Sequence, residues 1–113
     1  MPDSGRFDKG FNLEDGSKLG KYTIETHFNN ERSIIRYKEY SYDITIKFIN
    51  NRRRVFTQEE IEDLKRLFSN SISSSRIIYT AYGNPYECSI TINHSYEDGI
   101  YYVFECKGHA YRV

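Results

Sequence analysis

Apolar and polar residues alternate with a period of two along much of the chain. The clearest run places four apolar residues on one face and polar residues between them: Tyr42, Ile44, Ile46 and Phe48. Strict alternation is typical of a strand with one buried face, so this segment is predicted to be a central strand. Residues 21–28 show the same pattern. Asn29 and Asn30 tolerate a positive φ and predict a hairpin there into 31–39, followed by a bend or bulge near 39–41.

The strongest local signal begins at Thr57. Thr57 and Glu60 have the spacing of a capping box, in which each side chain accepts a hydrogen bond from the other residue's backbone amide. Apolar residues then recur at helical spacing: Ile61, Leu64 and Phe68. These features predict one amphipathic helix over about residues 58–70.

Three more strands are expected after the helix, separated by a turn at 83–85 and a three-residue loop at 97–99. That loop length would pair Ile90 with Cys106 and His94 with Tyr102, all on the apolar face. The sequence therefore predicts an α+β fold: a mostly antiparallel sheet of five to six strands with one helix on one face, in the order β(2–3)-α-β3.

The pattern divides the chain into a mobile tail, residues 1–20, and a single domain, residues 21–113. The tail holds four of the seven glycines and few large apolar groups, which favours mobility. A second interpretation stays open. Phe7, Phe11 and Leu13 would then be anchors that dock on a partner or on the body of the domain.

Charge and cysteine content narrow the class of protein. Sixteen basic and sixteen acidic residues give a net charge of zero, which argues against a nucleic-acid binder that works by phosphate neutralisation and against an acidic DNA mimic. No apolar run is long enough for a membrane span or a secretion signal, so a cytoplasmic protein is expected. Cys88 and Cys106 are expected to be reduced, buried thiols, set diagonally on adjacent strands.

Motifs for chemistry are sparse. The cysteine and histidine spacings fit no zinc site, and no phosphate-binding glycine loop is present, so neither a metal nor a cofactor is expected. A metal-independent RNase stays open as the third hypothesis, with a base, an acid and an arginine drawn from neighbouring strands. Its candidate residues are Arg76, Glu87, His94, Glu105 and His109.

Binding residues are the better candidates. Arg52, Arg53 and Arg54 form a basic run ahead of the helix, and Tyr101 with Tyr37 is expected on the polar face of the sheet. Tyr and Arg are favoured anchors of protein interfaces. The leading hypothesis is a non-catalytic module that binds another protein, an inhibitor or accessory factor of phage or mobile-element origin. Single-stranded nucleic-acid binding through the same face is second, and homo-oligomerisation stays open.

Overall fold

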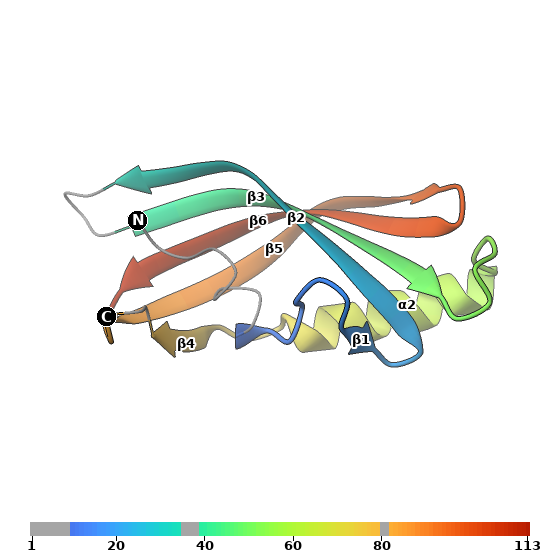
Figure 1. The fold of residues 1–113 in the computed structure, drawn as a ribbon, viewed down its shortest axis with the longest axis horizontal. Coiled ribbons are helices and arrows are strands. Elements are labelled where there is room, and N and C mark those ends of the chain that lie inside the picture. Colours follow the sequence, from blue (N-terminus) through green and yellow to red (C-terminus); the bar gives the residue numbers. More distant parts are fainter. Residues whose placement is uncertain (1–9, 35–38, 80–81) are drawn as a thin grey trace.

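The protein is an antiparallel sheet with a single helix against one face, in the residues that the computed structural model describes, 10–34, 39–79 and 82–113. Figure 1 shows the long strands crossing at a strong twist, with the helix under one end. The elements are β1 (Lys18–Leu19), β2 (Tyr22–Ile34), β3 (Glu39–Asn50), α2 (Gln58–Ser71), β4 (Arg76–Tyr79), β5 (Pro85–Asp98) and β6 (Tyr101–Arg112). The predicted α+β class and element order are confirmed.

The sheet has the order β1-β2-β3-β6-β5-β4, so it consists of two similar halves. In each half a short edge strand precedes a long hairpin, and β3 and β6 meet antiparallel at the centre. Helix α2 connects the two halves. This arrangement leaves β2 and β5 unpaired along much of their outer edges within the described residues, because β1 and β4 are short.

Aromatic side chains form the contact between α2 and the sheet. Phe68 of the helix lies 4.4 Å from Phe104 and 5.5 Å from Phe48, measured between ring centroids. The Tyr22 hydroxyl donates to Asp63 of the helix at 3.0 Å, so this phenol is both packed and hydrogen-bonded. Since aliphatic residues are few, these ring contacts supply much of the apolar surface buried in the core.

The helix begins as predicted. Thr57 accepts a hydrogen bond from the Glu60 amide at 3.1 Å, and the Glu60 carboxylate accepts from the Thr57 amide at 2.9 Å. Phe56 and Ile61, on either side of this capping box, are both buried. In the described part of the chain no helix has the length and apolar character needed to cross a membrane.

The boundary expected at residue 21 falls inside the packed region. Phe11 and Leu13 are 1% and 0% exposed and belong to the hydrophobic core. The Leu13 carbonyl accepts from the Thr26 hydroxyl at 2.6 Å, and the Phe11 carbonyl accepts from Ser71 at 3.3 Å. Residues 10–20 therefore pack on the body of the domain, which was the second interpretation of this segment. Phe7 lies outside the described residues.

The hairpin expected at Asn29 and Asn30 is wrong. Strand β2 continues to Ile34, and the chain absorbs the irregularity as a bulge between Asn29 and Arg32. Asparagine tolerates unusual backbone angles, and such angles occur in bulges as well as in turns, which explains the error. The segment that joins β2 to β3 lies outside the described residues, and the expected bend near 39–41 is the regular start of β3.

The predicted register of the last hairpin is also wrong. Gly99, with φ of +59°, takes the first place of a two-residue loop, and a bulge at Asn93 shifts β5 by one residue. Cys106 therefore faces Ile92 instead of Ile90, and Cys88 faces Ala110. The two thiols are buried and free, but four residues apart along the ladder.

Candidate functional site

The face of the sheet that points away from α2 is the most distinctive surface of the molecule. The register sets four-residue rows across β2, β3, β6 and β5 on this side. From the Gly99 turn outward, the rows are Thr23, Ile49, Tyr101 and Asp98; Glu25, Lys47, Val103 and Tyr96; His27, Thr45, Glu105 and His94; Asn29, Asp43, Lys107 and Thr91. We call this surface the open face, since no described element packs on it (Figure 1).

Charge on the open face is strongly unbalanced. Two further rows, toward the C-terminal end of β6, add Glu39 and Glu87. Among the described side chains, six carboxylates therefore share this face with two lysines: Glu25, Glu39, Asp43, Glu87, Asp98 and Glu105 against Lys47 and Lys107. The zero net charge of the chain conceals this local acidity.

Three tyrosines of the open face are paired with three of these carboxylates. Tyr111 donates to Glu87, and Tyr96 donates to Glu105 at 3.4 Å. A hydrogen bond to Glu25, together with the negative charge of that residue, raises the pKa of Tyr101. Each phenol is therefore held as a neutral donor, with its ring exposed or half-buried beside a carboxylate.

Two of the paired tyrosines, Tyr96 and Tyr101, lie beside a packed centre near the Gly99 turn. Val103 is completely buried although it lies on the open face, between its cross-strand neighbours Lys47 and Tyr96. The Lys47 ammonium lies 5.5 Å from the centroid of the Tyr101 ring, a cation–π contact. Tyr96 is 42% exposed. This end of the face thus combines rigid aromatic rings with fixed negative charge.

A shallow depression of about 440 Å³ lies beside the Asn93 bulge. It is lined by Asn29, Asp43, Asn93, His94, Glu105 and Cys106. His94 lies opposite Glu105 and stacks on Tyr96 at 5.8 Å, so the prediction that His94 occupies the apolar face is wrong. The reason is the bulge, which inverts the facing of every β5 residue that follows it.

The residues considered for an RNase do not converge. Arg76 lies on the α2 side, where its guanidinium donates to the Ser71 and Ser74 carbonyls at 3.2 and 2.7 Å. His109 lies near the far end of the open face and contacts Glu39 at 3.0 Å. The depression beside His94 is lined by two carboxylates and no lysine or arginine, so its electrostatics oppose a phosphodiester.

The loop that carries the three arginines is organised by one buried residue. The Asn50 side chain accepts from the amides of Arg52 and Arg54 at 3.1 and 3.3 Å and donates to the Arg54 carbonyl at 2.7 Å. Asn50 is 1% exposed. Arg53 has φ of +54°, a left-handed conformation that disfavours side chains with a Cβ. The loop is therefore fixed in one shape.

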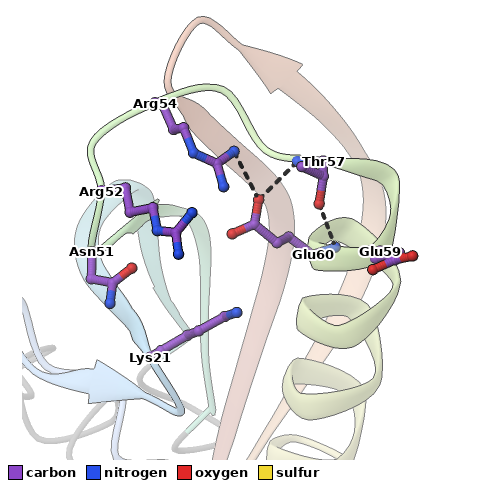
Figure 2. A pocket seen from close by; sticks show the side chains of 7 residues that line it. All are labelled: Lys21, Asn51, Arg52, Arg54, Thr57, Glu59 and Glu60. Atoms are coloured by element: carbon purple, nitrogen blue, oxygen red, sulfur yellow. Dashed lines mark hydrogen bonds and ion pairs between the residues drawn. The ribbon is translucent and has the colours of Figure 1, made fainter.

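This shape separates the arginines. Arg52 and Arg54 line a pocket of about 320 Å³ together with Lys21 and the start of α2 (Figure 2). There Arg54 forms an ion pair with Glu60 at 3.5 Å, and hydrogen bonds from Thr57, followed by the positive charge of Arg54, lower the pKa of Glu60. We call this site the cationic pocket. It lies on the α2 side of the sheet.

Arg53 does not line this pocket and lies close enough to Tyr101 to affect it. The Glu25 carboxylate raises the pKa of the Tyr101 phenol, and the positive charge of Arg53 opposes that effect. The structure therefore brings together Arg53 and Tyr101, but not all three arginines with Tyr101. Tyr37 lies outside the described residues. Tyr96 was missed from the sequence because the wrong register placed it on the apolar face; the glycine that opens a two-residue loop was the available signal.

No protein-family model matches the chain, and no curated protein matches its sequence. In the described part of the chain, no group of three or more His, Cys, Asp or Glu side chains is placed to hold a metal ion.

Proposed function

We propose that the protein is a non-catalytic binding module that engages another protein through the open face. The observation that carries this proposal is the set of tyrosine–carboxylate pairs at Tyr96, Tyr101 and Tyr111 on a sheet face that no described element covers. Tyrosine gives a large contact area with little loss of side-chain entropy, and hydrogen bonds to the carboxylates reduce that loss further.

The dimensions of the open face suit a protein interface. Tyr101 and Tyr111 are ten residues apart on β6, so the face is about 33 Å long, and four strands make it about 19 Å wide. That area, roughly 600 Å², is comparable to one side of a standard protein–protein interface. The two described pockets are shallow and polar, which favours a broad contact over an enclosed small molecule.

Nucleic-acid binding is the weaker candidate because of the charge on this face. Tyrosine rings beside Glu25 and Glu105 could stack on bases, but the carboxylates would repel the phosphates that accompany them. An inhibitor or accessory protein that covers a surface of its target requires no cleft and no catalytic residue. The open face is an uncovered surface with tyrosine side chains, which is sufficient for such a role.

The test is capture of a partner from the native host by tagged protein, comparing the wild type with Tyr96→Ala and Tyr101→Ala. We expect one specific protein to be retained, and each substitution to weaken that complex by about 1–3 kcal/mol. Tyr82→Ala is the matched control, since Tyr82 is 91% exposed in the turn before β5. Retention by both open-face variants would contradict the proposal, as would submicromolar binding of a single-stranded oligonucleotide at about 150 mM salt.

A further inference from the structure

The carboxylates of the open face define the chemistry of what it binds. Because six acidic residues share this surface with two lysines and the neighbouring Arg53, its local charge is negative even though the whole chain is neutral. Charges act over about 8–10 Å at physiological salt. A partner docked on the open face therefore experiences the local acidity and, of the basic loop, mainly Arg53 beside Tyr101, since Arg52 and Arg54 line the cationic pocket.

The tyrosine–carboxylate pairs favour guanidinium and ammonium groups in particular. A planar guanidinium stacks on an aromatic ring and hydrogen-bonds a carboxylate at its edge. Tyr96 with Glu105 and Tyr101 with Glu25 offer these two features side by side. The chain itself contains an example, since Lys47 lies against the Tyr101 ring.

We propose that the occupant of the open face is a basic, arginine-rich protein surface, which contacts Tyr101 with Glu25 and Tyr96 with Glu105. This inference rests on the proposed protein-binding function and adds the charge of the partner. Such a surface is typical of proteins that bind nucleic acids, because they expose arginine and lysine to neutralise phosphates. A module with this chemistry would compete with phosphate for those side chains.

The experiment measures binding of a synthetic decaarginine peptide by calorimetry at about 50 and 200 mM salt. We expect wild-type protein to bind it, with affinity falling at least about fivefold at the higher salt. The Glu25→Gln/Glu105→Gln variant should bind about tenfold more weakly, equivalent to about 1.4 kcal/mol. Glutamine keeps the size of each side chain and removes only its charge.

The matched control is Glu59→Gln/Glu62→Gln, which removes two charges from exposed positions of α2. It should leave decaarginine affinity within about twofold of the wild type, because screening hides charges on the other side of the sheet. Equal weakening by the two double variants would overturn the inference, since net charge alone would then explain binding. Stronger binding of decaglutamate or of a single-stranded oligonucleotide would overturn it as well.

Failure of this inference can be distinguished from failure of the proposed function. If Tyr96→Ala and Tyr101→Ala abolish capture of the host partner while Glu25→Gln/Glu105→Gln leaves that complex and its salt dependence unchanged, the face binds protein but not through basic groups. If the tyrosine substitutions do not affect capture, the proposed function itself is wrong.

Discussion

Gly108 is the position where adding one methyl group should have the largest effect. It lies in β6 directly opposite Tyr42 and has no positive φ, so Gly108→Ala introduces a steric clash in the folded state without backbone strain. The new Cβ would overlap the Cε2 and Cζ atoms of the Tyr42 ring and lie 2.6 Å from its hydroxyl oxygen. Tyr42 is 1% exposed and its ring lies 5.3 Å from that of Phe28, so it has little room to move.

Overpacking of this kind costs about 1–3 kcal/mol, and the reduced freedom of the unfolded chain returns less than about 1 kcal/mol. We expect Gly108→Ala to reduce the free energy of unfolding by about 2 kcal/mol and the melting temperature by about 8–10 °C. Urea unfolding followed by circular dichroism measures this change. Stability within about 0.5 kcal/mol of the wild type would refute the steric argument.

A double-mutant cycle identifies the clash itself. Tyr42→Leu removes the two ring carbons and the hydroxyl oxygen that the new methyl would meet, so Gly108→Ala should cost at least about 1 kcal/mol less in that background. Tyr42→Phe is the matched control, because it keeps Cε2 and Cζ and should give no relief. If both backgrounds respond alike, the strain lies elsewhere.

Three other substitutions or conditions test the core and the helix. Thr57→Ala should reduce the free energy of unfolding by about 1 kcal/mol through loss of the cap, measured by urea unfolding; an unchanged value would mean that the cap contributes nothing. Deleting residues 1–20 should remove the burial of Phe11 and Leu13 and cost about 3–6 kcal/mol, whereas a detached tail would leave stability unchanged. Burial, followed by the charge of a neighbouring glutamate, raises the pKa of Cys88 and of Cys106 to about 12. The unfolded thiols ionise near pH 9 while the folded ones stay protonated, so stability should fall from about pH 9 to 12, by up to about 1.4 kcal/mol per pH unit for each thiol; a Cys88→Ala/Cys106→Ala variant with the same pH profile would contradict this cause.

Helix α2 and strand β3 could be predicted from the sequence because independent signals agreed there. The capping box at Thr57 and Glu60, the apolar stripe and the distribution of charge all indicate the same helix. In β3 the alternation from Tyr42 to Phe48 is unbroken, and the burial of its residues alternates with it. Both elements could therefore be predicted without information from distant parts of the chain.

Only part of the β5 register could be predicted: Gly99 indicates the two-residue loop, but the bulge leaves little trace in local composition. Asn93 is a polar residue between Ile92 and His94, and it fits the alternation of an unbroken strand equally well. One extra residue inverts the facing of those that follow, which transfers Tyr96 and His94 to the open face. Phe11 and Leu13 could not be assigned between a mobile tail and docked anchors for a related reason: isolated apolar residues have no period, and their burial depends on contacts with β2 and α2.

The charge of the binding surface shows most clearly what composition cannot say. The equal numbers of acidic and basic residues argued against an acidic nucleic-acid mimic. That argument assumes that the two signs of charge are mixed evenly over the surface. The fold separates them instead: Glu25 and Glu105 lie on the open face, while Arg52 and Arg54 are held at the cationic pocket by the bonds of Asn50. A partner is attracted by the charges within a Debye length of its own surface, not by the sum over the chain. Zero net charge therefore sets the long-range field of this protein, and the alternation of side chains along β2 and β6 sets what the open face attracts.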